Sequence, residues 1–354
     1  MRSLPLRGRL SDVNRPALRD SLQRPLGALR LSVTDRCNLR CNYCMPEEEY
    51  TWLPRAGLLN FDELTRVARL FLELGVRRIR LTGGEPLLRR GLSELVRQLG
   101  ALDGLDELAM TTNGVLLGSQ AAQLFEAGLR RITVSLDTLS AERFQRLTRK
   151  NEHAQVLAGI EAACSAGLVV KLDTVLLRGV NEDEIAPLLA YAAHVGAELR
   201  FIEYMDVGGA TRWEPTSVVS RTEILARVQE AFGTITPKDG RGAAPAETFS
   251  LANGTSFGVI ASVTTPFCGA CDRSRVTADG LWYTCLYATR GLDLKAQLRS
   301  GATDETLRAL LEAAWTKRDD RGAEERKTLP HREALIPVSA LRGDPHLEMH
   351  TRGG

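Results

Sequence analysis

Three cysteines near the start of the chain have the spacing of ligands to a small inorganic centre. Cys37, Cys41 and Cys44 follow one another as C-x3-C-x2-C. A 4Fe-4S cluster has four irons that each need a terminal ligand, and thiolates usually supply all of them. Three cysteines would leave one iron open to a ligand from outside the protein. A zinc site is the alternative, but zinc usually takes four ligands, with cysteines in C-x2-C pairs, and fits this triad poorly.

A second set of three cysteines, Cys268, Cys271 and Cys285, has the spacing C-x2-C-x13-C. Taken alone, this spacing suits zinc and an iron–sulfur cluster almost equally. In a chain that already has one open triad, we interpret the second as another 4Fe-4S cluster with its own open iron. One open iron would then hold a cofactor and the other the substrate. The remaining Cys164 lies in a helical pattern, where a buried, inert cysteine is expected.

Two arginines lie just after the second set of cysteines. Arg273 and Arg275 alternate in a segment that reads as a strand, so their side chains point the same way. Paired guanidinium groups bind phosphate oxygens in a bidentate manner. The alternative is that both are ordinary solvated arginines, since arginine is abundant in this chain.

Polar and glycine-rich segments follow several of the predicted strands. They are Thr82-Gly83-Gly84-Glu85-Pro86, Met110-Thr111-Thr112-Asn113-Gly114 and Val134-Ser135-Leu136-Asp137. Two adjacent glycines allow a backbone to approach a ligand closely. Arg80 and Lys171 add cations to the same strands. Each of the two could be a surface charge, but together they favour a site for an anion.

Composition sets the class of protein. The chain has 354 residues, 44% hydrophobic and 25% charged, with a net charge of +2, so no overall field attracts it to nucleic acid or membrane. We see neither a signal peptide nor a run long enough to span a bilayer, and we expect a soluble, cytoplasmic protein. Seven clustered cysteines favour metal or cluster ligation over a disulfide framework.

The elements that must position these residues alternate between strand and helix. The predicted strands cover 29–33, 78–81, 107–110, 132–136, 169–175 and 199–204. A helical period at 61–74 begins with Asn60 and Glu63, which have the spacing of a capping box. The same signal recurs at Asn181 with Glu184 and at Ser220 with Glu223. Six strand–helix units in series predict an incomplete (β/α)6 TIM-like barrel, with ligands at the C-terminal ends of the strands.

The alternation of strand and helix patterns ends near residue 235, where a Gly/Pro-rich loop begins. We therefore divide the chain into an N-terminal extension at 1–25, a partial barrel at 26–235 and a smaller C-terminal α+β region at 246–330. The last region would carry the second cluster and bind substrate. We predict that 331–354 is a flexible tail that ends in Gly353-Gly354.

These motifs together resemble the GTP 3′,8-cyclase family of molybdenum cofactor biosynthesis, within the radical S-adenosylmethionine (SAM) superfamily. The resemblance rests on Arg30–Pro46, on the three strand-end segments, on Phe201–Met205 and on Phe267–Arg275. It spans about 25–330 and the final glycine pair. Arg178 stands where lysine is expected, a departure that does not touch the chemistry.

The resemblance implies a role for each matching residue. Cys37, Cys41 and Cys44 would bind the SAM cluster, and Cys268, Cys271 and Cys285 an auxiliary cluster. The residues implied to contact SAM are Tyr43, Gly84, Ser135 and Met205. Those implied to bind GTP are Arg30, Arg80, Thr111, Lys171, Arg273, Ser274 and Arg275. The final Gly353 and Gly354 would reach into the active site and support catalysis.

The resemblance also implies a reaction. The enzyme would be a lyase that converts GTP to 3′,8-cyclo-7,8-dihydro-GTP by abstracting the C3′ hydrogen with a 5′-deoxyadenosyl radical. Two 4Fe-4S clusters and SAM are the implied cofactors. The implied partners are a flavodoxin- or ferredoxin-type electron donor and the downstream pyranopterin monophosphate synthase, with no nucleic acid and no membrane. A homodimer is compatible with the sequence. The competing readings are a peptide-modifying radical SAM enzyme and a zinc-binding interaction module.

Overall fold

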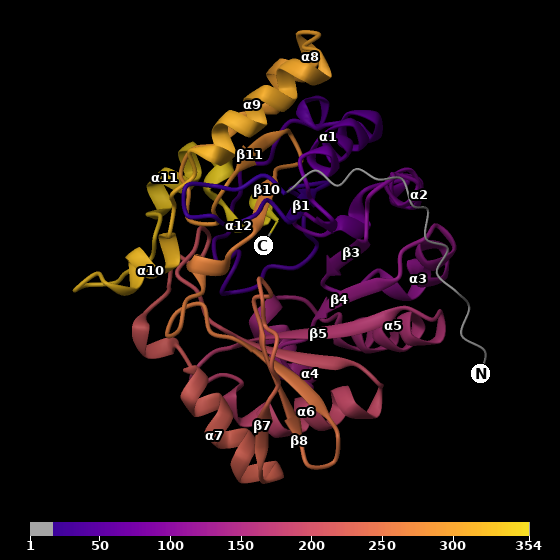
Figure 1. The fold of residues 1–354 in the computed structure, drawn as a ribbon. Helices are drawn as coiled ribbons and strands as arrows, with labels where there is room; N and C mark the ends of the chain where they lie inside the picture. The colour runs from indigo at the N-terminus through magenta and orange to yellow at the C-terminus, as the bar shows by residue number, and fades with distance from the viewer. Residues whose placement is uncertain (1–16, 354) are drawn as a thin grey trace.

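A single sheet of twelve strands organises residues 17–353, the part of the chain that the computed structural model describes. Figure 1 shows the sheet curving around the middle of the molecule, with helices on its outside. The strand order is β12-β11-β10-β1-β2-β3-β4-β5-β6-β9-β8-β7. The strands are β1 (Ala28–Ser32), β2 (Arg78–Thr82), β3 (Glu107–Thr112), β4 (Arg131–Ser135), β5 (Val169–Leu176), β6 (Glu198–Glu203), β7 (Ile235–Pro237), β8 (Glu247–Leu251), β9 (Ser256–Ile260), β10 (Arg273–Val276), β11 (Leu281–Tyr283) and β12 (Leu292–Asp293).

The parallel part of the sheet confirms the predicted fold class, an incomplete barrel with added C-terminal elements. β1 to β6 pair in parallel in chain order. Two later strands extend this set, because β10 pairs in parallel with β1 and β9 pairs in parallel with β6. The C-terminal elements are thus built onto both edges of the barrel sheet. Because β10 runs parallel to β1, the residues that precede β10 lie at the amino ends of the barrel strands, whereas those that follow β1 lie at the carboxyl ends.

The helices cover the outer side of the sheet, except α12 (Met349–Arg352), which lies on its inner side, where the Arg352 carbonyl accepts a bond from Arg275 of β10. They are α1 (Phe61–Glu73), α2 (Leu92–Gly100), α3 (Leu117–Glu126), α4 (Ala141–Thr148), α5 (His153–Ser165), α6 (Ile185–His194), α7 (Arg221–Phe232), α8 (Leu294–Arg299), α9 (Asp304–Thr316), α10 (Gly322–Lys327), α11 (Val338–Gly343) and α12 (Met349–Arg352). Among residues 17–353, no helix has the length and apolar character needed to cross a lipid bilayer.

Two of the three predicted capping boxes are present. Asn60 accepts a bond from the Glu63 N–H at 2.8 Å while the Glu63 carboxylate accepts one from the Asn60 N–H, and Ser220 with Glu223 caps α7 in the same way. The third prediction is wrong. The Asn181 side-chain amide donates to the carbonyls of Asp137 and Val175, at 2.8 and 2.9 Å. It therefore ties together the loops after β4 and β5 instead of capping a helix.

The end of the chain is packed, so the prediction of a flexible tail over 331–354 is wrong for the residues described. Glu348, His350 and Arg352 are 5%, 3% and 2% exposed. A Cβ added at Gly208, in the loop after β6, would lie 1.8 Å from the Leu347 carbonyl oxygen. The short helices at this end of the chain, α11 and α12, have little stability of their own. This segment is ordered by contacts with distant parts of the chain, which local sequence patterns do not reveal.

Asp206 is a main attachment point for the C-terminal segment. Its carboxylate is fully buried and accepts bonds from Arg326 and Arg332 at 2.7 Å and from the Tyr287 hydroxyl at 3.1 Å. Burial alone would raise the pKa of Asp206, but the bonds and charges of Arg332 and Arg326 lower it overall. A carboxylate of this kind stabilises the fold above the pKa of the unfolded state, and the stabilisation is lost as pH falls through the folded-state pKa.

Replacing Asp206 with Ala is therefore expected to lower the free energy of unfolding by about 3 kcal/mol at pH 7, because it leaves two largely buried guanidinium groups unpaired. The difference from wild type should shrink below about pH 4, where the unfolded-state carboxyl is protonated. Denaturant titrations at both pH values measure this. Asp183→Ala is the matched control, because Asp183 pairs with Arg143 while 64% exposed, and it should cost less than about 1 kcal/mol. Equal effects of the two substitutions would contradict the prediction.

Candidate functional site

A cavity of about 560 Å³ runs along the inner side of the parallel strands, from carboxyl-end residues such as Ser135 to amino-end residues such as Arg78 and Arg131. Its volume is in the range of sites for small molecules and cofactors. All six cysteines of the two triads line it. The two triads come from loops far apart in the sequence, and the pairing of β10 with β1 brings them to one space.

The first triad lies in the loop that follows β1. The glycines after β2 pack against this loop, since a Cβ on Gly83 would lie 2.4 Å from the Thr34 carbonyl oxygen and one on Gly84 would lie 2.4 Å from that of Arg36. The backbone N–H of Glu85 also donates to the Arg36 carbonyl at 2.7 Å. The two glycines are therefore required by close packing against the cysteine loop. Gly84 also lines the cavity, as expected for a ligand contact.

The cysteines of the first triad repel one another as thiolates. Burial raises the pKa of Cys41 well above its usual value, and the charges of Cys37 and Cys44 raise it further. Burial, with the nearby Glu85, likewise raises the pKa of Cys37 to about 11. The Asn113 side-chain amide donates to the Cys37 sulfur at 3.8 Å. Such a group of thiols becomes stable as thiolates once a cationic centre binds them.

The four residues expected to contact SAM all line the same cavity. They are Tyr43, Gly84, Ser135 and Met205. The Tyr43 hydroxyl donates to the Asp137 carboxylate at 2.6 Å. Burial raises the pKa of Asp137 to about 6, although the hydrogen bond from Tyr43 acts to lower it. The pair fixes the Tyr43 ring beside Cys44, which would orient a ligand on the first triad.

The second triad receives N–H donors. The Tyr287 N–H donates to the Cys285 sulfur at 3.4 Å, and an Arg273 Nη donates to the Cys271 sulfur at 3.5 Å. Burial raises the pKa of Cys268, and backbone N–H bonds from Glu324 and Ala323 oppose this. Hydrogen bonds to cysteine sulfur are among the means by which proteins tune iron–sulfur clusters. The donor set therefore fits thiolate ligands.

Buried charges brace the backbone of this second triad. Arg24 donates to the Cys268 carbonyl at 3.0 Å, and Arg318 donates to the Cys271 carbonyl at 2.9 Å. Both guanidinium groups also bind the carboxylate of Asp20, at 2.5 and 3.2 Å. The sequence analysis missed these residues, because the contacts of Arg24 with Cys268 and of Arg318 with Asp20 join residues distant in the chain and have no local signature.

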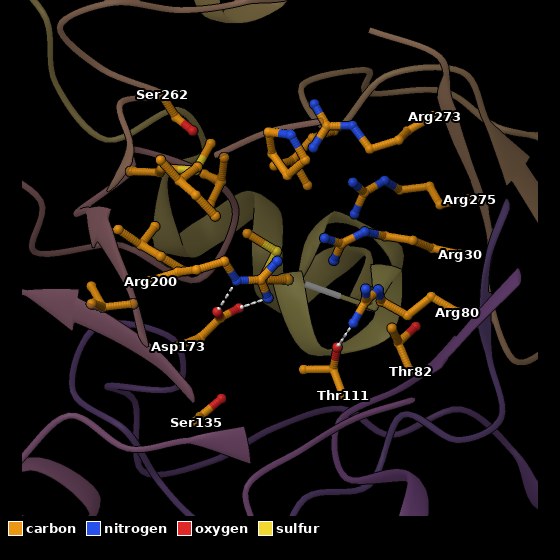
Figure 2. A pocket seen from close by; sticks show the side chains of 18 of the residues that line it. Arg30, Arg80, Thr82, Thr111, Ser135, Asp173, Arg200, Ser262, Arg273 and Arg275 are labelled. Carbon is orange, nitrogen blue, oxygen red and sulfur yellow. Dashed lines mark hydrogen bonds and ion pairs between the residues drawn. The ribbon is translucent and has the colours of Figure 1, made fainter. Parts of the chain in front are cut away.

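Four arginines form one wall of the cavity, which we call the arginine wall: Arg30, Arg80, Arg273 and Arg275. Figure 2 shows their guanidinium groups pointing into the cavity from neighbouring strands. The register explains the arrangement. Arg275 of β10 lies opposite Arg30 of β1, which lies opposite Arg80 of β2. Like charges directly opposite on adjacent strands are destabilising, so this row is costly without an anion.

The pKa values of three of these arginines are lowered by burial and by charge repulsion. Burial is the main cause that lowers the pKa of Arg30, followed by the charges of Arg275 and Arg80. Burial and neighbouring arginines lower the pKa of Arg80 and of Arg275 to about 10. Among residues 17–353, no carboxylate forms an ion pair with any member of the arginine wall. A polyanion such as a triphosphate would relieve the repulsion.

The opposite wall carries a cation that the sequence analysis missed. Arg200 of β6 is 9% exposed and forms a bidentate pair with Asp173 at 2.7 and 2.9 Å, as seen in Figure 2. Lys171 also lines the cavity, where it pairs with Glu198 at 2.8 Å. Thr111 accepts a bond from Arg80 at 3.2 Å. The alternation of Arg200, Ile202 and Tyr204 on one face of a predicted strand could have identified Arg200.

Two of the predicted site residues need separate comment. The prediction that Ser274 contacts substrate is not supported, because Ser274 alternates with Arg273 and Arg275 and faces away from the cavity, where it is 1% exposed. Gly353 lies at the arginine wall, where its carbonyl accepts bonds from Arg30 at 3.3 Å and Arg275 at 3.5 Å. Gly354, predicted with it, lies outside the described residues.

Within residues 17–353, no three His, Cys, Asp or Glu side chains are grouped closely enough to hold one ion.

Family models match the two parts of the chain. Residues 31–192 match the radical SAM superfamily, and residues 197–324 match the Molybdenum Cofactor Synthesis C family. The fold is similar to that of SuiB from Streptococcus suis, solved with its precursor peptide SuiA. That likeness has a TM-score of 0.60 and 15% sequence identity, and it covers 86% of this chain and 67% of SuiB.

Curated relatives match almost the whole chain. GTP 3′,8-cyclase 1 of Mycobacterium tuberculosis (strain CDC 1551 / Oshkosh) is 51% identical over 345 residues, which is 96% of each chain. GTP 3′,8-cyclase of Staphylococcus aureus (strain Mu3 / ATCC 700698) is 44% identical over 317 residues, 87% of this chain and 93% of the relative. The chain belongs to the GTP 3′,8-cyclase family of molybdenum cofactor biosynthesis, within the radical SAM superfamily.

Proposed function

We propose that this chain is a lyase that converts GTP to 3′,8-cyclo-7,8-dihydro-GTP, and that both cysteine triads and the arginine wall act in that reaction. The observation that carries the proposal is the meeting of two three-cysteine sets and four like-charged arginines in one cavity. Each triad can hold a 4Fe-4S cluster with one open iron. The arginine wall then supplies the counter-charge for a triphosphate.

The first triad and its neighbours would hold SAM. Cys37, Cys41 and Cys44 bind the cluster, and Tyr43, Gly84, Ser135 and Met205 contact SAM. When bound, this cluster and SAM supply a radical able to remove the hydrogen from C3′ of the GTP ribose, so that C3′ can bond to C8 of guanine. The protein contributes position, because the reacting atoms must be held together and kept from water.

The arginine wall would orient GTP across the cavity. Arg30, Arg273 and Arg275 bind its phosphates, and Arg80, whose guanidinium donates to Thr111, extends the row toward Arg200. Lys171 lines the same cavity. Cys268, Cys271 and Cys285 would hold the second cluster, whose open iron would be available to bind the guanine. The experiment that tests the whole assignment is anaerobic incubation of the reconstituted protein with GTP, SAM and reductant, followed by chromatography for the cyclised nucleotide. Failure to form it would overturn the function proposed.

The second cluster is expected to account for about half of the bound iron. Replacing Cys268, Cys271 and Cys285 together with Ala should halve the iron and sulfide content, because each triad holds one four-iron cluster. Anaerobic iron and sulfide analysis on the wild type and the triple variant measures this. SAM cleavage without GTP should persist in the variant. Unchanged iron content would contradict the second cluster.

The glycine tail is expected to affect turnover more than binding. Deleting Gly353 and Gly354 should spare cluster content and GTP affinity but lower the yield of cyclised product on the order of a hundredfold, because a small misplacement at the reacting centre is sufficient for such a loss. A synthetic peptide with the sequence of residues 345–354 should partly restore turnover. Full activity of the truncated protein would show that the tail is passive.

We further infer the partners that the reaction requires. A flavodoxin- or ferredoxin-type protein would supply the electron, and a pyranopterin monophosphate synthase would receive the product. Both stay predictions, as does a homodimer.

A further inference from the structure

Arg352, just before the glycine pair, is buried in a way that its place near the end of the chain does not suggest. It is 2% exposed. Its Nε donates to the His346 carbonyl at 2.5 Å, and one Nη donates to the carbonyls of Leu286 at 3.1 Å and Ala288 at 2.6 Å. Its guanidinium also lies 4.5 Å from the centre of the Tyr283 ring. A buried charge is tolerated only with bonds of this kind.

The groups that hold Arg352 flank a ligand of the second triad. Tyr283 and Leu286 lie on either side of Cys285, whose sulfur accepts the N–H of Tyr287. From Thr284 to Gly291 this loop has no helix or strand. The directions of its carbonyls are therefore set by side-chain contacts and by whatever Cys285 binds, rather than by a hydrogen-bonded ladder.

The other end of the same short segment touches the arginine wall. The Arg352 carbonyl accepts a bond from Arg275 at 3.3 Å, and the Gly353 carbonyl accepts from Arg30 and Arg275. Gly353 has a φ of +67°, and a Cβ there would lie 2.0 Å from the Thr82 hydroxyl oxygen. Figure 1 shows α12 beside β1 and β10. The segment thus joins the Cys285 loop to the anion site.

We propose that Arg352 is a positioning residue that couples occupation of the second cysteine site to the seating of the C-terminal segment at the arginine wall. Ligation of Cys285 fixes the carbonyls of Leu286 and Ala288 in the directions that bind the guanidinium. That binding holds Gly353 at Arg30 and Arg275. The inference rests on the proposed function, since it needs a cluster at the second triad. The coupling is reciprocal, so a seated tail also favours cluster retention.

The alternative is that Arg352 only packs in the interior, in which case occupation of the second cysteine site has no effect on the C-terminal segment. Hydrogen–deuterium exchange of residues 349–353 in the full-length protein distinguishes the two cases. The first triad is removed by Ala at Cys37, Cys41 and Cys44, because the tail also contacts the loop beside Cys44. In this background, loading the second site with iron and sulfide under anoxic conditions should slow exchange of the tail by at least about fivefold.

Substitutions of Arg352 test whether the coupling depends on its guanidinium group. Arg352→Gln should exchange at the same rate with and without iron and should release iron to a chelator faster by the same factor. Arg352→Lys keeps the charge without the planar fork of donors, so it should restore only part of the coupling. Arg342→Gln, an exposed arginine on α11, is the matched control and should behave as the parent protein.

Two results would overturn the inference, and they are distinguishable. If iron analysis shows a cluster at the second triad but tail exchange is the same with and without it, the coupling is wrong while the proposed function stands. If iron analysis shows no cluster there, the second-cluster assignment itself fails and the coupling fails with it. The parent protein alone gives both the iron content and the exchange rate of the tail. The inference can therefore be contradicted even if an Arg352 variant folds poorly.

Discussion

Replacing any one of Cys37, Cys41 and Cys44 with Ala will abolish SAM cleavage. The loss should be complete because the chemistry needs a cluster with three protein ligands and one open iron, and two thiolates cannot present it. All three cysteines line the cavity, where burial raises the pKa of each. The measurement is the yield of 5′-deoxyadenosine from SAM and reductant under anoxic conditions, read by chromatography.

The chain contains its own control for this experiment. Cys164 lies on α5, away from the cavity, where its thiol donates to the Val195 carbonyl at 3.5 Å. Cys164→Ala should leave SAM cleavage within about twofold of wild type, because it removes only a weak hydrogen bond and a small packing contact. Formation of 5′-deoxyadenosine at wild-type yield by a first-triad variant would show that these cysteines do not hold the SAM cluster.

Replacing Arg275 or Arg273 with Ala will weaken GTP binding by about ten- to a hundredfold while both clusters assemble normally. Each charge-assisted hydrogen bond to phosphate is worth about 1.5–3 kcal/mol, and both arginines face the cavity in Figure 2. The loss should be smaller for guanosine than for GTP, since only the phosphates are affected. Isothermal calorimetry with GTP and with guanosine, alongside iron analysis, measures both.

Arg97→Ala is the matched surface control, because Arg97 is 60% exposed and pairs with Glu94 on α2. It should leave GTP affinity unchanged. The affinity of the wild type should also fall as salt rises, whereas that of the Arg275 variant should fall less steeply. GTP affinity equal to wild type in the Arg275 and Arg273 variants, with normal iron content, would return these residues to an ordinary structural role.

The arginine wall destabilises the fold by charge repulsion, although we propose that it binds the phosphates of the substrate. Arg275, Arg30 and Arg80 stand in register on three neighbouring strands, where like charges repel. The tail relieves part of this, since the Gly353 carbonyl accepts bonds from two of them. A triphosphate bound as proposed would therefore meet the end of the chain at the same guanidinium groups, and we expect the tail to be sensitive to what occupies the cavity.

Local patterns were sufficient for the elements and for the reactive groups. Six parallel strands, α1 with its Asn60–Glu63 cap and both cysteine triads follow from spacing and periodicity, because each depends on residues close together in the chain. The alternation of Arg273 and Arg275 correctly placed both on one face of a strand. The same alternation shows why Ser274, between them, is turned away from the cavity.

Tertiary structure alone decided how these parts meet. The pairing of β10 with β1 places the arginine wall between the first triad, which follows β1, and the second triad, whose Cys268 and Cys271 precede β10. The bonds of Arg24 to Cys268, of Arg318 to Cys271, of Asn181 to Asp137 and of Arg352 to Leu286 all join residues far apart in the chain. Such contacts depend on strand register and close packing, which no short window of sequence encodes. The sequence by itself therefore determined the elements and the spacing of the cysteines and arginines, whereas the pairing of strands and the packing of the tail determined where these groups lie.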